Sequence, residues 1–384
     1  MLLSQTYVLG QRAGKQLPYK AAQPDSILIY HAQPIEVNAD KPDVDAQSAT
    51  PVQSLDRQEI QNLSVINVAD AVKHLPSVML KDYGGIGGLK TISVRSLGAE
   101  HTAVFINGIK YSDAQTGQVD LGRFGTDNLE RIELLSTGLQ DAACLPAIAY
   151  ASTSSLNLVT DDKMNWQGGK PFHLKSSLVG GSFGYSALRL GGDVRISDAI
   201  FAGLNVERTQ ADGEYEYTFQ NGQLEETRTR QNTDIEFTRI ESDLGFKLSE
   251  DSKLQLKLYG YSSERGLPGA VIIGNNALSR ERLWNDEFLV QGTFSTLFFD
   301  KLETKVRAKY AYNDVRYKDP DYLISIGGLD DWFTQHEAYA SVSFTYPVVR
   351  FLSASLSSDL SLNTLDASQF NDNPKRLSWL SVIA

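Results

Sequence analysis

The sequence is poor in the residues from which most catalytic and metal sites are built. It contains one cysteine, Cys144, which excludes an internal disulfide and any zinc site made of cysteines. Its five histidines are scattered and form no His-Glu-x-x-His motif. We therefore expect no catalytic metal and no cofactor.

Positive charge and long apolar runs are scarce as well. The 36 Lys and Arg residues against 47 Asp and Glu give a formal net charge of -11, which argues against a nucleic-acid partner, because such proteins carry basic stripes. No apolar run reaches the roughly 18 residues of a membrane helix. A hydrophobic content of 41% nevertheless excludes wholesale disorder.

The length and the N-terminus set further limits. At 384 residues the chain has room for two or three ordinary domains, or for one small domain and a large β structure. The N-terminal stretch MLLSQTYVLGQRAGKQ contains basic residues but no apolar core of signal-peptide length, which taken alone predicts a cytoplasmic protein. The rest of the chain predicts a different location.

A glycine-rich stretch, GGIGGLKTISVRSLG from Gly84 to Gly98, invites a nucleotide-binding interpretation. The Walker spacing fails because the second required glycine falls on Leu89, and the dinucleotide fingerprint fails at Lys90. The residues that follow alternate as a strand does, whereas both motifs open a helix. A second decoy, GGSFG around Ser182, matches a nucleophile elbow but also precedes an alternating strand. Neither stretch predicts catalysis.

Residues 52–160 have the pattern of a small mixed α/β domain. SVINVADAVKHLPSV predicts a helix, ended by Pro76, whose apolar face is formed by Val68, Ala71, Val72 and Leu75. A strand is expected around Thr91–Arg95. TAVFINGIKYSD predicts a hairpin, because Asn107-Gly108 supplies the positive φ angles of a two-residue turn.

From residue 171 onward the pattern changes to long segments of period-two alternation. We expect about ten strands there, many of about ten residues or more, which is longer than the strands of most soluble sheets. Short connections such as ISDA, SEDS and FDK alternate with long ones. This alternation is typical of an outer-membrane barrel. A soluble β-sandwich or propeller is the alternative, and it predicts shorter strands without the asymmetry in loop length.

Several stretches resemble the plug domain of TonB-dependent outer-membrane receptors. They are INVADAVKHLPSV, ISVRSLGAEHTAVFINGIKYSD, NLERIELLSTG and AYASTSSLNLVT, in the order of that family. TGQVDLGRF and RGLPGAV are similar to the cobalamin-receptor-like branch of Bacteroidetes-type bacteria. The resemblance implies an α+β plug domain over residues 52–160, followed by an antiparallel transmembrane β-barrel from 171 to 384. Residues 1–51 would be an N-terminal extension.

The resemblance also implies a function in the cell outer membrane. A large, scarce nutrient would bind between external loops and the plug, and the TonB energy-transducing protein would then draw the plug aside, so no enzymatic step is expected. The branch implies cobalamin or a related corrinoid as ligand, and a surface lipoprotein as a further partner. Within the same class, a ferric siderophore or haem is the alternative ligand. From another class, a surface binding or adhesion module, or an inactive fragment, remains open.

The resemblance predicts which residues contact the ligand. Gly84–Gly88 would be a flexible loop at the plug apex, and YSDAQTG a second apical loop; a purely structural turn is the alternative for the first. An external loop of the barrel would add two tyrosines, although the same acidic stretch also allows a solvated loop or a calcium site. The predicted contacts are Tyr83, Gly84, Gly85, Gly87, Tyr111, Ser112, Gln115, Tyr215 and Tyr217.

Two further sets of residues have predicted roles. In QPIEVNA, the residues Ile35, Glu36 and Val37 are the best candidate for the Ton box, the segment that pairs with TonB as an added strand. DSILIY and an ordinary linker are the alternatives. Arg95 and Arg131 match plug arginines that pair with barrel glutamates in the family, the alternative being weak surface ion pairs.

The chain departs from the family in its number of strands. The family barrel has about twenty-two strands around a plugged lumen, whereas about ten are expected here. A barrel of that size leaves too little room for a plug, and an open sheet exposes unpaired backbone to lipid. We therefore expect the sequence to be one part of a larger barrel, completed by further sequence or by another chain.

Overall fold

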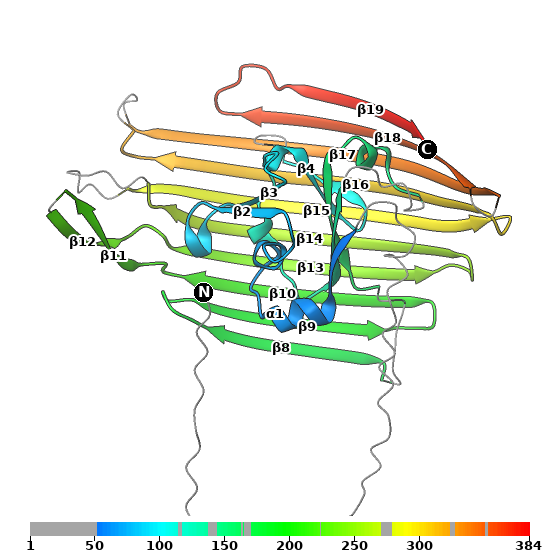
Figure 1. The fold of residues 1–384 in the computed structure, drawn as a ribbon, viewed down its shortest axis with the longest axis horizontal. Coiled ribbons are helices and arrows are strands. Elements are labelled where there is room, and N and C mark those ends of the chain that lie inside the picture. The colour runs from blue at the N-terminus through cyan, green and yellow to red at the C-terminus, as the bar shows by residue number, and fades with distance from the viewer. Residues whose placement is uncertain are drawn as a thin grey trace, which may run out of the picture. The chain divides into compact units, whose positions relative to one another are not determined.

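The computed structural model describes residues 52–113, 117–136, 144–162, 164, 170–222, 224–269, 279–322, 327–349 and 352–384. These residues form two regions, a small α+β domain up to residue 162 and a large antiparallel sheet from residue 172 (Figure 1). We call the first region the plug and the large sheet the wall. No helix within the described ranges is both long and apolar enough to cross a membrane.

The plug contains a five-stranded sheet and a separate two-stranded one. The first has the order β1-β6-β7-β4-β5, with β4 and β7 parallel and the other neighbours antiparallel; its strands are β1 (Gln53–Asp56), β4 (Thr102–Ile106), β5 (Ile109–Tyr111), β6 (Leu129–Ser136) and β7 (Ser154–Thr160). The second pairs β2 (Val78–Asp82) with β3 (Lys90–Val94). The helices are α1 (Arg57–Leu63), α2 (Val68–Val72) and α3 (Ala147–Tyr150), and single 3-10 turns are η1 (Gly85–Gly87), η2 (Ala99–His101) and η3 (Leu121–Arg123).

Local chemistry explains where these elements begin and turn. Helix α1 begins at Asp56, which forms a capping box with Glu59, and α2 begins at Asn67, whose side chain accepts the N–H of Asp70 at 3.0 Å. The predicted helix face is confirmed as buried, although α2 itself is only five residues long. Asn107 and Gly108 have φ of 51° and 75°, as the predicted two-residue turn requires.

The apolar core of the plug continues into the wall. The plug contributes side chains that are at most 1% exposed, among them Val68, Val72, Ile132, Leu156 and Leu158. The same cluster includes Tyr259 and Leu289 of the wall, each 1% exposed. Burying a large apolar side chain stabilises a protein by about 1.5–3 kcal/mol. The plug therefore packs on the wall as part of one core.

The wall has ten strands, which confirms the expected number, and they pair in chain order except that the separate β11–β12 hairpin comes between β10 and β13. In spatial order they are β8 (Phe172–Gly180), β9 (Ser186–Arg195), β10 (Ile200–Ala211), β13 (Ile235–Lys247), β14 (Ser252–Leu267), β15 (Glu281–Phe298), β16 (Leu302–Asp319), β17 (Leu329–Val349), β18 (Leu352–Ala367) and β19 (Lys375–Ile383). The connections 196–199, 248–251 and 299–301 lie at one end, and the longer 212–234, 268–280 and 320–328 at the other. The predicted short–long alternation is therefore confirmed.

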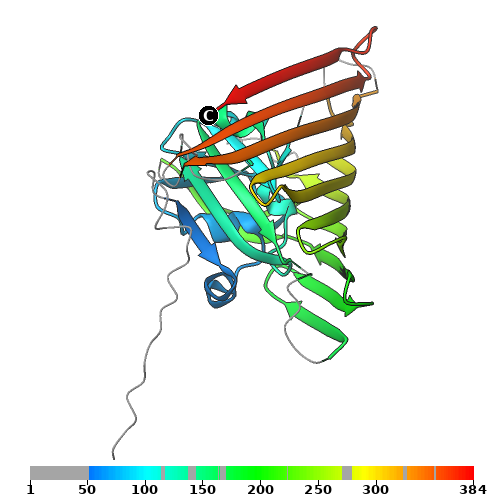
Figure 2. The same cartoon turned by 90° about the vertical axis from the view of Figure 1, so that its right-hand side faces the viewer.

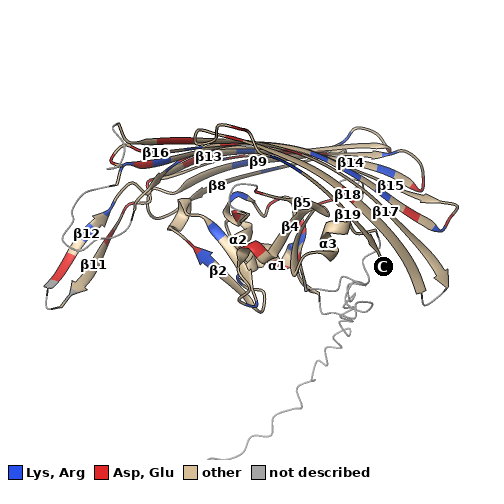
Figure 3. Cartoon of the chain, turned by 90° about the horizontal axis from the view of Figure 1, so that it is seen from above, with Lys and Arg blue, Asp and Glu red and all other residues tan. Residues whose placement is uncertain are grey.

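The two faces of the wall differ in polarity. Neighbouring side chains of a strand point to opposite faces, so in β13 Arg239 and Asp243 are buried on one face while Ile240 is 47% exposed on the other. The plug lies on the first face, over which the wall curves (Figures 2 and 3). Apolar residues are exposed on the opposite face of most strands, including Leu188, Leu190, Leu204, Phe288, Val306, Leu356, Leu360 and Leu362. Apolar outside and polar inside is the arrangement of a membrane barrel.

Candidate functional site

The glycine-rich stretch that raised the nucleotide question forms a hydrogen-bonded turn at one end of the plug. Oδ1 of Asp82 accepts the N–H groups of Gly84 and Gly85 at 3.0 and 3.1 Å. The N–H of Tyr83 donates to the carbonyl of Leu89 at 3.0 Å and closes the turn. Gly85 has φ of 70°, a conformation that favours glycine. The backbone N–H groups are thus used within the turn, and Tyr83 is left 61% exposed.

The wall holds this turn from the other side. Nη1 of Arg265 donates to the carbonyl of Gly87 at 2.7 Å. A Cβ on Gly87 would lie 3.1 Å from Cβ of Ile235, and one on Gly88 would lie 2.4 Å from the backbone nitrogen of Gly84. These glycines therefore permit close approach of the turn to the wall and to itself, which answers why the sequence is glycine-rich here.

Two carboxylates, the exposed Asp82 and the buried Asp120, connect the turn to the plug through Lys90. Lys90 forms an ion pair with Asp82, and the backbone N–H of Lys90 donates to Oδ1 of Asp120 at 3.1 Å. Burial opposes ionisation of Asp82, but Lys90 and the two glycine N–H groups outweigh it and hold the pKa of Asp82 below its ordinary value. Asp82 therefore stays ionised and keeps the turn closed.

The second predicted ligand loop begins inside the interface between plug and wall. Tyr111 is 6% exposed and packs edge-on against Phe124 at a centroid distance of 5.1 Å. Burial and the nearby carboxylate of Glu287 raise its pKa well above the ordinary value. The Oγ of Ser112 donates to Oε2 of Glu337 at 2.6 Å. Tyr111 is predicted as a ligand contact; its ring packs in the apolar core and also borders a cavity of about 450 Å³, and the contact stays a prediction.

The predicted external tyrosines stand on a hairpin, β11 (Tyr215–Asn221) and β12 (Leu224–Arg230), that projects to the plug's side of the wall (Figure 3). Phe183, Tyr215, Tyr217 and Phe219 form a row with ring centroids 6.0, 6.3 and 6.1 Å apart. The guanidinium of Arg228 lies 4.9 Å from the centroid of Phe219. Because Arg228 pairs with Glu226 at 2.6 Å, what this row offers is half-exposed rings, among them Phe183 and Tyr215.

Two plug arginines, Arg131 and Arg95, are predicted to pair with barrel glutamates. Arg131 pairs with Glu133 and Glu130 of its own strand, and its predicted pairing with a barrel glutamate stays a prediction. Glu133 is within reach because residues two apart on a strand share one face. Arg95 is in the turn after β3, where it has φ of 51° and its backbone N–H donates to the carbonyl of Ser77 at 3.0 Å. Its predicted pairing stays a prediction.

Other ion pairs join the plug to the wall. Each combines one residue from either region: Arg123 with Glu287 (3.6 Å), Asp120 with Arg265 (3.6 Å), and Asp127 with Arg189 (3.5 Å). Burial opposes the charge of Arg123, but Tyr111 and the carboxylates of Asp120 and Glu287 raise its pKa above the ordinary value. These pairs could not be predicted from the sequence, because the two partners of each pair lie far apart in the chain.

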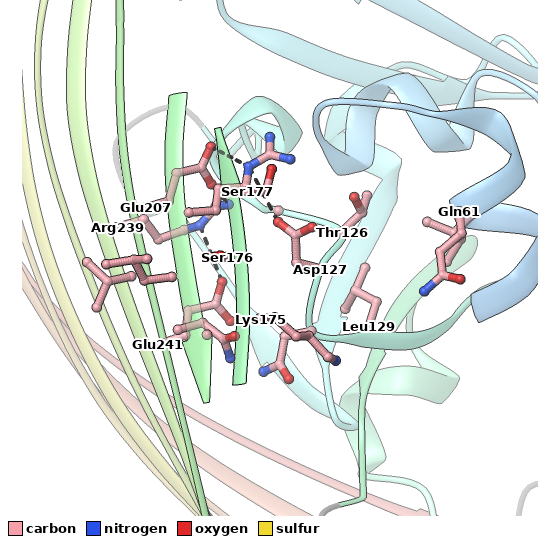
Figure 4. Close-up of a pocket in the computed structure, with 18 of the residues that line it drawn as sticks. Gln61, Thr126, Asp127, Leu129, Lys175, Ser176, Ser177, Glu207, Arg239 and Glu241 are labelled. Carbon is pink, nitrogen blue, oxygen red and sulfur yellow. Dashed lines mark hydrogen bonds and ion pairs between the residues drawn. The ribbon is translucent and has the colours of Figure 1, made fainter. Parts of the chain in front are cut away.

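A cavity of about 320 Å³ separates α1 of the plug from strands β8–β13 (Figure 4). Its wall side is a network in which Arg239 pairs with Glu207 and Glu241, and Lys257 pairs with Glu241 at 2.8 Å. Gly125 of the plug lies against this network, since a Cβ there would overlap the guanidinium of Arg239. The cavity is thus polar and charged on one side.

Several predictions lie outside the residues that the structure describes. They are Gln115 in the second apical loop and the Ton-box candidates Ile35, Glu36 and Val37. Within the described ranges, the side chains of His, Cys, Asp and Glu form no group of three that would hold a metal ion.

Comparison with known proteins matches this arrangement. Residues 45–143 match the TonB-dependent Receptor Plug Domain. Over 117 residues the chain is 31% identical to the vitamin B12 transporter BtuB of Vibrio vulnificus (strain YJ016), a segment that covers 28% of this chain and 19% of that protein.

Two solved structures illustrate the likeness in fold. The copper transporter OprC has a TM-score of 0.61 at 12% identity, over 88% of this chain and 50% of that one. The siderophore receptor PiuA from Acinetobacter baumannii has a TM-score of 0.57 at 15% identity, over 86% and 53%. This chain spans about half of the length of these solved proteins, and at such identities the likeness shows the fold alone. Residues 45–143 therefore resemble a TonB-dependent receptor plug domain, and the described residues as a whole share the fold of about half of each of these solved proteins.

Proposed function

We propose that this chain serves the TonB-dependent uptake of a large nutrient across the outer membrane, with a cobalamin-type corrinoid as the substrate. One observation carries the proposal: a plug domain is held on the polar face of a membrane wall by ion pairs and hydrogen bonds. A plug attached in this way blocks passage until it moves, so uptake requires a ligand signal and an energy source. We infer no chemical step on the substrate.

The choice of substrate rests on sequence similarity. The segment that matches the vitamin B12 transporter is the only comparison described above that exceeds 30% identity. A ferric siderophore is the second candidate. It is favoured by the aromatic row on the β11–β12 hairpin, since exposed aromatic faces suit a flat, aromatic ligand.

The proposed ligand contacts are the parts of the predicted set that remain exposed. Tyr83 and the glycine turn form the plug side, and Tyr215 with Tyr217 form the opposite side. Ser112 donates a hydrogen bond to Glu337, so we propose that it holds its loop in place. In support, Gly87 of the turn lies against Ile235, the first residue of β13 after the long connection 212–234, and β11 and β12 are part of that connection.

The proposed partners follow from the same function. TonB would pair with the N-terminal segment that contains Ile35, Glu36 and Val37, by adding a strand through main-chain hydrogen bonds. A surface lipoprotein would cover the ligand from outside. Loss of energised uptake on substitution of Ile35 by proline, which cannot donate a backbone N–H, would support the first of these pairings.

The test is binding of labelled cyanocobalamin to outer membranes that contain the full-length protein. We expect saturable binding that Tyr83→Ala weakens at least several-fold, because that change removes an exposed aromatic face at the proposed contact. Phe299→Ala is the matched control, since Phe299 is 91% exposed in the turn at the opposite end of the wall. If the membranes bound a ferric catecholate siderophore and not cyanocobalamin, the siderophore would become the proposed substrate.

A further inference from the structure

The cavity of about 450 Å³ that Tyr111 borders lies between the plug and the last strands of the wall. Ser112, Asp113 and Gly117 of the second predicted ligand loop line it from the plug, and residues of β17, β18 and β19 line it from the wall. Its volume is within the range of about 300–1,000 Å³ that small-molecule sites occupy. A ligand held by this loop therefore has space to extend between the plug and the wall.

Two cations line this cavity without a counter-ion, Lys110 of β5 from the plug and Arg376 of β19 from the wall. Within the part of the chain that the structure describes, neither side chain forms an ion pair or a hydrogen bond; of Lys110 only the carbonyl is bound, by Nζ of Lys309 at 2.6 Å. Burial lowers the pKa of Lys110; Glu337 opposes this, and the charges of Lys309 and Arg376 add to it. The three cations are thus close enough to repel one another.

Two buried carboxylates of the wall that line the cavity are engaged elsewhere. Glu337 pairs with Lys309 at 2.7 Å and accepts the hydroxyl of Ser112 at 2.6 Å. Asp359 accepts the N–H of Ile148 at 2.8 Å, and its other oxygen is buried. Neither carboxylate is therefore placed as the counter-ion of Lys110 or Arg376.

The two carboxylates that line the cavity from the plug have other partners as well. Glu100 lies 3.8 Å from His101, and Asp113 has an interaction of its own. Charges are costly to hold in a partly buried space without a partner, and two cations around one cavity add repulsion. An anion between Lys110 and Arg376 would remove both costs.

The type of cation and the neighbouring hydroxyl groups suit a phosphate or carboxylate group. A guanidinium donates two parallel hydrogen bonds to such a group, and an ammonium adds a compact charge. Ser361 and Ser378 line the same cavity. Oγ of Ser361 accepts Nδ2 of Asn363 at 2.9 Å, which leaves its own O–H free to donate. The cavity therefore combines two unpaired cations with hydroxyl donors.

We infer that this cavity binds the phosphodiester of the proposed corrinoid substrate between Lys110 and Arg376, while the predicted loops hold the rest of the ligand. The inference rests on the proposed function and names the group of the substrate that this site recognises. Cyanocobinamide has the same corrin ring as cyanocobalamin but lacks the phosphodiester. Lys110 and Arg376 are thus assigned as residues that distinguish the complete corrinoid from this shorter one.

The test compares the two corrinoids on outer membranes that contain the full-length protein. Lys110→Met and Arg376→Gln each remove one charge at nearly constant side-chain size. We expect each to raise the dissociation constant of labelled cyanocobalamin about fivefold or more, as the loss of a charge-assisted hydrogen bond does, and that of labelled cyanocobinamide less than about twofold. Lys375→Met is the matched control, because Lys375 is the neighbour of Arg376 on the opposite face of β19.

The comparison between ligands separates a local effect from a general one. If Lys110→Met and Arg376→Gln weakened the binding of both corrinoids equally, the inference would be overturned, because a disturbed fold or loop acts on both ligands. Unchanged binding of cyanocobalamin in both variants would overturn it too.

Inorganic phosphate tests the anion site if the wild type binds neither corrinoid. Acetylation of Lys110 by an N-hydroxysuccinimide ester is measured by mass spectrometry in sodium phosphate and in sodium chloride of equal ionic strength. We expect phosphate to slow it about threefold or more in the wild type but not in Arg376→Gln, because the anion would cover the ammonium. The exposed Lys301, in the turn 299–301, is the reference. Protection would support the site and replace only the substrate, and equal rates would overturn the site.

Discussion

The plug and the wall bury opposite kinds of side chains. In the plug, Val68 and Ile132 are fully buried and charged groups lie around them, as in a water-soluble domain. In the wall, Arg239 and Lys257 are buried on the inner face, and Leu204 and Leu360 are half exposed on the outer one. The difference shows that the wall needs two environments. Its outer face is apolar, as a lipid-facing surface is, and its inner face carries charges of which some pair with the plug.

A cavity in the plug core should produce the largest loss in the free energy of unfolding. Ile132 is 0% exposed, and truncation of a buried isoleucine costs about 2–5 kcal/mol, so Ile132→Ala should lower the free energy of unfolding by that amount. Leu204→Ala, at a position 50% exposed on the outer face, should have a much smaller effect. Denaturant titration of the protein in detergent micelles measures both. Equal losses would contradict the assignment of the two faces.

A charge on the outer face should produce the next largest effect. Leu360 lies near the middle of β18 and is 48% exposed, and an arginine on a lipid-facing position near the bilayer midplane costs about 2–4 kcal/mol. Leu360→Arg should therefore impair folding into lipid vesicles. Ser361→Arg is the control, because Ser361 is on the inner face and lines a polar cavity. If both variants inserted equally well, the outer face would not contact lipid.

Removal of one partner of a plug–wall ion pair should have an intermediate effect. Glu287 is 7% exposed and 3.6 Å from Arg123, which keeps Asp120 when Glu287 is lost. We expect Glu287→Ala to destabilise the attachment of the plug by about 1–3 kcal/mol, the penalty for an incompletely paired buried group. Protease sensitivity of the plug in membranes reports the loss.

The control for that variant is an ion pair at the surface of the wall. Glu236 pairs with Arg208, and about half of each side chain is exposed, so Glu236→Ala should change stability by less than about 1 kcal/mol. A plug that becomes equally protease-sensitive in both variants would show that Glu287 has no special part in the attachment.

The smallest predicted effect concerns pH and the glycine turn. Because the pKa of Asp82 is lowered in the folded turn, its carboxylate stabilises the turn above about pH 3.9, the ordinary value, and this is lost as the pH falls through the lowered pKa. Hydrogen exchange of the Gly84 and Gly85 amides should therefore show low protection only in acid. Asp82→Asn should abolish this pH dependence. Unchanged protection in that variant would contradict the role of Asp82.

Local pattern predicted the fold well. The alternation of apolar residues and the lengths of the connections were enough for ten antiparallel strands, and the apolar spacing around Val68 and Val72 was enough for the buried helix face. These features depend on residues near one another in the chain. The length of α2 was overestimated, because the turn after Lys73 continues with shorter-range hydrogen bonds.

Long-range contacts could not be predicted from the sequence. The burial of Tyr111 depends on Phe124 and Glu287, and the partner of Arg123 is on a strand more than 150 residues away. The contacts of Arg131 with Glu130 and Glu133 are local, and its predicted barrel partner stays a prediction. Charge pairs between a plug and a wall follow from register and packing, which no single stretch encodes.

The measurement that tests the account most directly is uptake of labelled cyanocobalamin by cells that have this full-length protein as their sole cobalamin receptor, with and without a protonophore. The account predicts saturable uptake that falls at least tenfold when the proton gradient is removed, while binding at the surface persists. Uptake that is indifferent to the gradient would contradict it, because a plug held by these contacts would then not need to be drawn from the wall.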